Sequence, residues 1–152
     1  MTSEKEKKDT HDLTVITTHV NSDFDAVASV LAAQKLYPGS VVVLPGSNEK
    51  NLRNFFISSM AYLFNMTDIQ NVDMNRVKRL VLVDTRQKNR IGQLSDILDK
   101  PDVEIHVYDH HPPTEEDVDA DLLVYEETGA TVSILTRRLK QEGLPISPDE
   151  AT

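Results

Sequence analysis

The stretch that decides the fold class is LTVITTHVNSDFDAVASVLAAQKLYPG, residues 13–39. Residues 13–20 are apolar and rich in β-branched side chains, which is typical of a buried strand. Residues 24–37 are rich in alanine and place apolar side chains at helical spacing, and Pro38-Gly39 then stops the pattern. This stretch therefore predicts a strand followed directly by a helix.

The same alternation continues along the chain. Short apolar runs predict further strands at residues 41–44, 80–83, 103–108 and 122–125. Helical spacing of apolar residues predicts helices at 51–64, 91–98 and 131–142, the last ending at Gly143. Strands that alternate with helices indicate βαβ units. We therefore predict an α/β fold with a mostly parallel five-stranded sheet and helices on both faces.

Length and composition indicate one soluble domain. The chain has 152 residues, of which 39% are hydrophobic and 27% charged. No apolar run approaches the ~20 residues that cross a bilayer. Residues 1–12 are predicted to be a disordered tail, and because they lack the apolar stretch of a signal peptide we expect a cytoplasmic protein. The absence of cysteine excludes disulfides and thiolate metal sites.

The formal net charge of −9 argues against a nonspecific nucleic-acid binder. Carboxylates gathered around divalent cations would contribute to the same charge. A solvated acidic surface explains it as well, so the charge decides little. At the other end of the chain, residues 144–152 resemble a loop leading into a new helix, with Ser147 as its cap and Pro148 in its first turn. We therefore expect residues 13–152 to be a domain truncated from a longer polypeptide.

Parallel sheets bind ligands beyond the carboxyl ends of their strands, and three such positions carry acids and histidines. In the first, His19 ends a strand, Asp23 lies in the turn and Asp25 opens the helix. An imidazole with carboxylates suits Mn²⁺ and similar divalent ions. Alternatively, Asp23 or Ser22 merely caps the helix and His19 is structural. This segment alone does not decide between the two interpretations.

The second position is Asp84, which follows four apolar residues. At the carboxyl edge of the sheet its carboxylate could bridge two cations. It could instead turn the chain or pair with Arg86. Arg86, in turn, could contact a phosphate or be an ordinary surface charge.

The third position is Asp109-His110-His111, followed by two prolines. Adjacent side chains of an extended backbone face opposite ways, so one imidazole could bind a metal while the other reaches substrate. Asp109 could orient an imidazole through its ring N–H. A pair of surface histidines is the alternative, but three strand ends carrying such residues favour a common site. His11 and His106 lie outside these positions, and we interpret both as structural or solvated.

The segments HVNSDFDAVAS (19–29), LVLVDTRQ (80–87) and YDHHPP (108–113) resemble the first three motifs of the DHH phosphoesterase family. This family includes RecJ-type exonucleases, oligoribonucleases, exopolyphosphatases and family II inorganic pyrophosphatases. The resemblance covers about residues 13–142. Residues 18–39 also resemble long bacterial proteins in which a DHH region is followed by CBS domains and a tRNA-nucleotidyltransferase or poly(A)-polymerase-like domain.

The resemblance implies a role for each motif residue. His19 and Asp23 would bind one metal ion, usually Mn²⁺, for which Mg²⁺ or Co²⁺ could substitute. Asp25 and His110 would bind the second ion, and Asp84 would bridge the two.

The remaining motif residues would act on substrate. His111 would contact the phosphate and Asp109 would support the histidines, so that the catalytic residues are His111, Asp109 and Asp84. Arg86 is the other candidate for substrate binding. Residues 127–131 resemble the small-residue segment that opens the next helix in this family, although a turn with Thr128 as helix cap explains them equally well.

The chain departs from the family pattern in two respects. A further aspartate that completes the second metal site, and the smaller substrate-binding domain, are not found in the 152 residues, and Asp149 lies in a helix-start context that does not suit that role. We therefore expect this fragment to bind metal incompletely and to be weakly active or inactive. Ser22 also replaces the commoner proline of the first motif.

We predict a Mn²⁺-dependent phosphoesterase that hydrolyses phosphodiester or phosphoanhydride bonds of nucleotides, oligonucleotides or polyphosphate with two ions roughly 3.5–4 Å apart. The alternative is a nucleotide- or RNA-binding or regulatory module of a multidomain tRNA nucleotidyltransferase or poly(A) polymerase. A metal-stabilised structural domain is a third, weaker interpretation. The expected partners are a phosphate-ester substrate and downstream domains of the same polypeptide, with no membrane; a homodimer is left open.

Overall fold

The computed structural model of the chain describes residues 12–20, 22–45 and 65–144. The predicted helix at 51–64 lies outside these ranges, as do His11, Asp149 and nearly all of the predicted tail.

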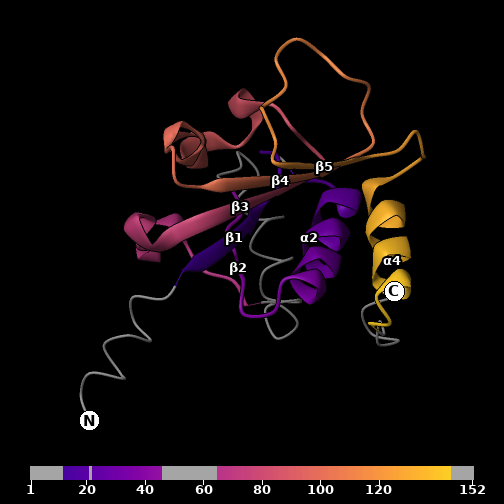
Figure 1. Ribbon diagram of the computed structural model, residues 1–152, viewed down its shortest axis with the longest axis horizontal. Helices are drawn as coiled ribbons and strands as arrows, with labels where there is room; N and C mark the ends of the chain where they lie inside the picture. Colours follow the sequence, from indigo (N-terminus) through magenta and orange to yellow (C-terminus); the bar gives the residue numbers. More distant parts are fainter. Residues whose placement is uncertain (1–11, 21, 46–64, 145–152) are drawn as a thin grey trace.

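A five-stranded sheet forms the centre of the molecule (Figure 1). Its strands are β1 (Leu13–Thr17), β2 (Val41–Val42), β3 (Val77–Val83), β4 (Glu104–Asp109) and β5 (Leu122–Tyr125). They lie in the order β2-β1-β3-β4-β5, and every neighbouring pair is parallel. The predicted five-stranded parallel sheet and α/β class are confirmed.

Helices cover both faces of the sheet. Helices α2 (Phe24–Leu36) and α4 (Thr131–Gln141) lie side by side on one face (Figure 1). The 3-10 helix η4 (Gly92–Asp99) packs on the other. Because successive side chains of a strand point to opposite faces, β3 contributes Val81 and Val83 to the core under α2 and α4, and Leu80 and Leu82 to the core under η4.

Several boundaries differ from the predicted ones. Strand β3 begins at Val77 rather than residue 80, because the polar Lys78 and Arg79 interrupt the apolar run while still lying in the sheet. Strand β1 ends at Thr17, three residues early; beyond it the N–H of Val20 donates to the carbonyl of Arg90 (2.7 Å). The predicted helix at 91–98 is the 3-10 helix η4. Three shorter 3-10 helices are η1 (Ile69–Asn71), η2 (Met74–Arg76) and η3 (Lys88–Arg90).

The strand order places a crevice between β1 and β3. After β1 the chain proceeds to β2 on one side of the sheet, whereas β3, β4 and β5 follow on the other side. The loops after β1 and β3 therefore diverge, and such a switch point is where open parallel sheets bind ligands. Two of the three predicted site segments follow these two strands.

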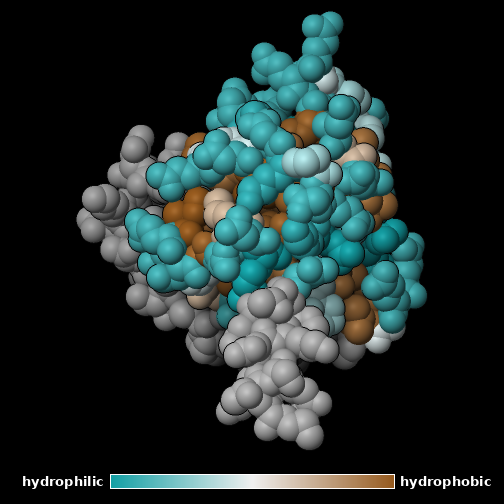
Figure 2. All heavy atoms as spheres, turned by 60° about the vertical axis from the view of Figure 1, so that its left-hand side comes forward, coloured by the Kyte–Doolittle hydropathy of each residue, from teal (hydrophilic) through white to brown (hydrophobic). Residues whose placement is uncertain are grey.

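The face that carries the 3-10 helices is shown in Figure 2. Hydrophilic residues cover most of it, with apolar residues visible between them. Among the large apolar side chains that the structure describes, Phe24 is the most exposed (77%), at the start of α2 between two of the predicted metal ligands. None of the described helices is long and apolar enough to cross a membrane.

Candidate metal centre

A cavity of about 600 Å³ opens at the carboxyl ends of β1, β3 and β4. Every residue singled out from the sequence as a site residue lines it: His19, Asp23, Asp25, Asp84, Arg86, Asp109, His110 and His111. Three chain segments far apart in sequence therefore converge on one cavity.

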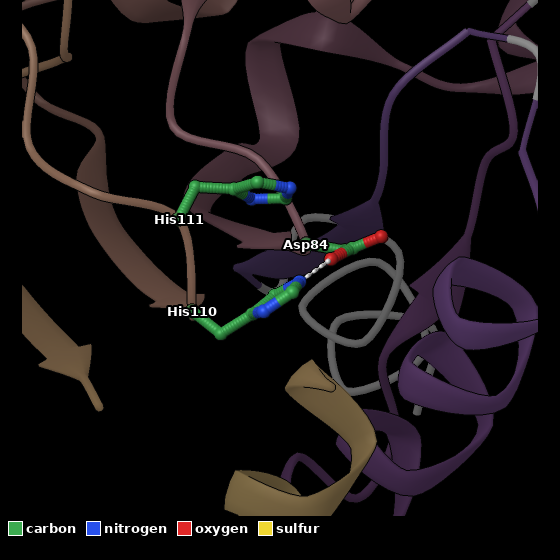
Figure 3. Close-up of side chains that lie close together, drawn as sticks. All are labelled: Asp84, His110 and His111. Carbon is green, nitrogen blue, oxygen red and sulfur yellow. Dashed lines mark ion pairs between the residues drawn. The ribbon is translucent and has the colours of Figure 1, made fainter. Parts of the chain in front are cut away.

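Asp84 lies at the centre of this arrangement. It directly follows β3, is 3% exposed and donates its N–H to the carbonyl of Tyr108 (2.9 Å). Its two carboxylate oxygens face different imidazoles. Oδ2 lies 3.1 Å from Nε2 of His19, and Oδ1 lies 3.2 Å from Nε2 of His110, as Figure 3 shows for the second pair. The predicted alternative partner, Arg86, is not the residue with which Asp84 pairs.

The backbone fixes the orientation of both imidazoles. Nδ1 of His19 lies 2.8 Å from the carbonyl oxygen of Val20, and Nδ1 of His110 lies 3.0 Å from that of Thr128. A carbonyl oxygen only accepts hydrogen bonds, so each Nδ1 must carry the proton that it donates. In the neutral imidazole, Nε2 then carries a lone pair, which is the form that binds metal ions.

This donor set fits divalent cations. A lone pair on each Nε2 faces an oxygen of Asp84, and two acceptors face each other favourably only when a proton or a cation lies between them. In the part of the chain that the structure describes, two groups have ligand atoms within 4.8 Å of one another: His19, Asp23 and Asp84 form the first, and Asp84, His110 and His111 form the second. Asp84 belongs to both, as a bridging ligand would.

Without a metal ion, the pKa values of His19 and Asp84 favour a charged imidazole next to a charged carboxylate. The hydrogen bond with Asp84 raises the pKa of His19 above its ordinary value, against the opposing effect of burial. Burial acts to raise the pKa of Asp84, but the hydrogen bonds from His19 and Thr131 outweigh it and lower that pKa. Without a cation, a proton on His19 stabilises the pair.

Asp23 caps a helix, as one of the two interpretations expected, and it also belongs to a group that could hold a metal ion. Its Oδ1 accepts the N–H of Ala26 (2.9 Å) and so caps α2, while its carboxylate belongs to the first ligand group. Ser22, the other candidate cap, donates its hydroxyl to the carbonyl of His19 (2.9 Å).

Asp25 caps a different helix from its own. Its Oδ2 accepts the N–H of Thr131 (3.0 Å) and its Oδ1 accepts the N–H of Val132 (2.9 Å), the first two residues of α4. Ala130, the residue before α4, offers no side-chain cap, so the proposed cap by Thr128 is wrong. Asp25 Oδ2 also lies 3.7 Å from Nε2 of His110, the residue predicted to share the second ion with it.

Thr131 is a site residue that the sequence reasoning missed. It is completely buried, and its Oγ1 donates a hydrogen bond of 3.0 Å to Oδ1 of Asp84. The two residues are 47 positions apart, so no local pattern relates them. The available signal was the small-residue segment that opens the last helix.

His110 and His111 do not face opposite ways as expected. Their ring centroids are 4.3 Å apart, and both rings point towards Asp84 (Figure 3). The reason is that β4 ends at Asp109, so the histidines lie in a loop where the alternation of a strand no longer applies. Nδ1 of His111 lies 2.6 Å from Oδ1 of the buried Asp109, an arrangement in which the carboxylate orients the ring.

Arg86 is buried and engaged by protein groups. Its Nε forms ion pairs with Asp117 Oδ2 (3.0 Å) and Asp109 Oδ2 (3.6 Å), and Nη2 donates to the carbonyl of His111 (2.9 Å). The guanidinium also lies 5.0 Å from the ring centroid of Tyr125. Arg86 thus supports the segment that carries the histidines, and its contact with substrate stays a prediction.

His106 lies apart from the cavity, in β4. Its ring nitrogens contact Tyr37 Oη (2.6 Å) and Glu104 Oε1 (2.5 Å), and Tyr37 Oη also lies 2.8 Å from Tyr108 Oη. These contacts give His106 the structural role expected for it.

Comparison with known proteins relates this chain to one family. The model of the DHH family, N-terminal domain, matches residues 13–152. The A-adding tRNA nucleotidyltransferase of Geobacter sulfurreducens is 41% identical over 138 residues, which are 91% of this chain and 16% of that protein. The chain therefore spans about a sixth of the length of this curated relative.

A solved structure shares the fold. The crystal structure of an exopolyphosphatase-related protein from Bacteroides fragilis superimposes with a TM-score of 0.57 and 18% identity. The match covers 93% of this chain and 43% of that one. At this identity the likeness supports the architecture alone.

Proposed function

We propose, from the premise that this chain belongs to the DHH family, that it is a metal-dependent phosphoesterase domain hydrolysing phosphodiester or phosphoanhydride bonds of nucleotides, oligonucleotides or polyphosphate. One observation carries the proposal: the two oxygens of Asp84 face Nε2 of two different histidines whose Nδ1 atoms donate to backbone carbonyls. A carboxylate held between two metal-binding imidazoles is suited to bridging a pair of cations.

The proposed cofactor is a pair of Mn²⁺ ions. His19 and Asp23 would hold one ion, Asp25 and His110 would hold the other, and Asp84 would contact both. When bound, such ions lower the pKa of a coordinated water and withdraw charge from phosphoryl oxygens. Imidazole and carboxylate ligands suit Mn²⁺, and also Co²⁺ or Mg²⁺.

The surrounding residues prepare these ligands. The carbonyls of Val20 and Thr128 keep the Nε2 atoms of both histidines directed at the site. Thr131 restrains the carboxylate of Asp84. Nδ1 of the half-exposed His111 is held by Asp109, so in its protonated form the ring would direct Nε2–H into the cavity as a donor to a phosphoryl oxygen.

The test uses the native chain that contains this domain. Release of phosphate or nucleotide is measured for pyrophosphate, polyphosphate, short RNA and single-stranded DNA while Mn²⁺ is varied. We expect Mn²⁺-dependent hydrolysis of at least one substrate, lost in Asp84→Asn. Asp102→Asn makes the same chemical change at an exposed position where the carboxylate pairs with Lys78, and should leave the rate unchanged. Hydrolysis that persists in Asp84→Asn would overturn the proposal.

A second function is favoured by the Geobacter relative, whose name describes a nucleotidyltransferase. In a multidomain protein of that kind, this domain could bind a nucleotide or an RNA end while another domain performs the chemistry. The same panel separates the two functions. Binding of nucleotide or RNA without hydrolysis of any substrate would support the binding module.

A further inference from the structure

The cavity is strongly acidic for a site that would take an anionic substrate. Five aspartates line it: Asp23, Asp25, Asp84, Asp109 and Asp117. Two divalent ions would offset part of this charge. Among the described residues that line the cavity, the permanently charged cations are Arg86 and Arg90. A second anionic group of the substrate could bind only where one of these two arginines is free to contact it.

Arg86 is already paired with carboxylates of the protein. Its guanidinium is 4% exposed and forms ion pairs with Asp109 and Asp117. Turning it towards substrate would leave Asp109, which is 1% exposed, as a buried carboxylate without its cation, and such a change is strongly unfavourable. Arg86 therefore holds the protein's own anions.

Arg90 is placed differently. It is exposed, and no hydrogen bond or ion pair to its guanidinium is found among residues 12–20, 22–45 and 65–144. Its backbone is nevertheless anchored at both polar atoms. The N–H donates to the carbonyl of Gln87 (3.1 Å), and the carbonyl accepts the N–H of Val20 (2.7 Å). A rigid base therefore carries a cationic side chain at the rim of the cavity.

The same hydrogen bond shows which of the two ligand groups is nearer to Arg90. Val20 follows His19 in sequence and its carbonyl accepts the proton of His19 Nδ1, so the backbone of Arg90 lies beside the first ligand group. His111 belongs to the second group, on the far side of Asp84. One phosphoryl group between the ions and His111 would not also occupy the space beside Arg90.

We propose that Arg90 binds a second phosphoryl group, next to the one that is attacked. The preferred substrates would then carry two phosphoryl groups close together, as in a phosphoanhydride or a 5′-phosphorylated dinucleotide, rather than one isolated diester. This inference rests on the proposed metal-dependent site. A guanidinium suits the task because it donates paired hydrogen bonds to phosphate oxygens.

The test measures binding, so that it does not depend on turnover. Dissociation constants for the Mn²⁺-loaded native chain are determined by calorimetry at fixed ionic strength. The probes are imidodiphosphate, which has two phosphoryl groups and resists hydrolysis, and methylphosphonate, which has one. We expect Arg90→Ala to weaken imidodiphosphate binding about tenfold and methylphosphonate binding less than about twofold. Arg90→Lys should lie between wild type and Arg90→Ala.

Lys140→Ala is the matched control, because it removes one exposed positive charge from α4, away from the cavity. It should leave both dissociation constants unchanged. A further arm compares imidodiphosphate with a 5′-phosphorylated thymidine dinucleotide, and the probe that depends more on Arg90 identifies the source of the second phosphoryl group.

The outcomes separate this inference from the proposed function. Unchanged imidodiphosphate binding in Arg90→Ala, equal weakening of both probes, or no binding of imidodiphosphate to wild type would each overturn the role of Arg90. Selective weakening in a protein that hydrolyses nothing would support Arg90 while rejecting the phosphoesterase. If hydrolysis requires Asp84 but imidodiphosphate binding is unchanged in Arg90→Ala, the phosphoesterase is supported and the role of Arg90 is rejected.

Discussion

Thr131 Oγ1 donates a hydrogen bond of 3.0 Å to Asp84 Oδ1, joining the start of α4 to the end of β3. Both residues are buried. The same carboxylate oxygen lies 3.2 Å from Nε2 of His110. The helix start therefore helps to set the direction in which the central carboxylate faces its histidines.

Replacing Thr131 by valine removes this hydrogen bond with little change in side-chain volume. Loss of a group that orients a metal ligand typically weakens metal binding about 10- to 100-fold. We expect the dissociation constant for Mn²⁺, measured by calorimetry on the native chain, to rise about tenfold in Thr131→Val. Thr131→Ser keeps the hydroxyl and should bind Mn²⁺ nearly as wild type does. Equal affinity in the valine and serine variants would contradict the prediction.

Asp84 has a backbone φ of +62°, in the left-handed region that glycine adopts easily and alanine does not. Both Asp84→Gly and Asp84→Ala remove the carboxylate, but only alanine has a Cβ that opposes this conformation. We expect the metal-free glycine variant to have the higher free energy of unfolding, by about 1–2 kcal/mol. Urea denaturation measures the difference. An alanine variant as stable as the glycine variant would show that the positive φ carries no such cost.

The carboxylate of Asp25 accepts the first two N–H groups of α4. Asp25→Ala leaves them without that acceptor, and loss of a helix cap costs about 0.5–2 kcal/mol. We expect amide hydrogen exchange in the metal-free protein to become faster at Thr131 and Val132. Asp23→Ala is the matched control because it removes the cap of α2, so exchange should become faster at Ala26 instead. Identical exchange at Thr131 in wild type and Asp25→Ala would rule out the cap.

His19 provides the pH-dependent prediction. Its hydrogen bond with Asp84 raises its pKa above 6.5, so in the metal-free protein we expect its imidazole to titrate above that value by NMR. The stabilisation that this raised pKa provides is fully present below pH 6.5 and is lost as the pH rises through the folded-state pKa. The lowered pKa of Asp84 acts in the other direction: its contribution is present above pH 3.8 and lost as the pH falls through the folded-state value.

The stabilising effect of this pair in the metal-free protein should therefore be greatest between pH 3.8 and 6.5. In Asp84→Asn the titration of His19 should move to a lower pH, because an amide does not stabilise the imidazolium as a carboxylate does. A His19 titration at the same pH in both proteins would contradict this. Because Mn²⁺ displaces the proton from Nε2, adding it should also release protons at a pH where His19 is charged.

The sequence predicted the sheet and the place of the candidate ligands at its edge well, because both depend on local patterns. Four apolar residues before Asp84 make a buried strand, and a residue that follows such a strand must lie at the carboxyl edge of a parallel sheet. The same reasoning placed His19 and His110, and the structure brings their Nε2 atoms to the two oxygens of Asp84.

The features that sequence reasoning missed are contacts between distant segments. Asp25 caps a helix 106 residues further along the chain, and no local pattern announces a cap that comes from elsewhere. Arg86 was expected to contact a phosphate or be an ordinary surface charge, whereas its position between Asp109 and Asp117 depends on how two loops pack. The start of β3 was missed because Lys78 and Arg79 interrupt its apolar pattern. Both are half-buried residues of the strand, between the buried Val77 and Leu80.

The ligands of the candidate metal centre follow three parallel strands, and a fourth segment, the start of α4, holds two of them in place. An incompletely paired sheet cannot assemble this constellation, so a cation with affinity for it would select the fully folded chain over every partly folded form. Chelation would then lower the melting temperature of the whole domain rather than loosen one loop, and the melting temperature would follow the free concentration of the ion.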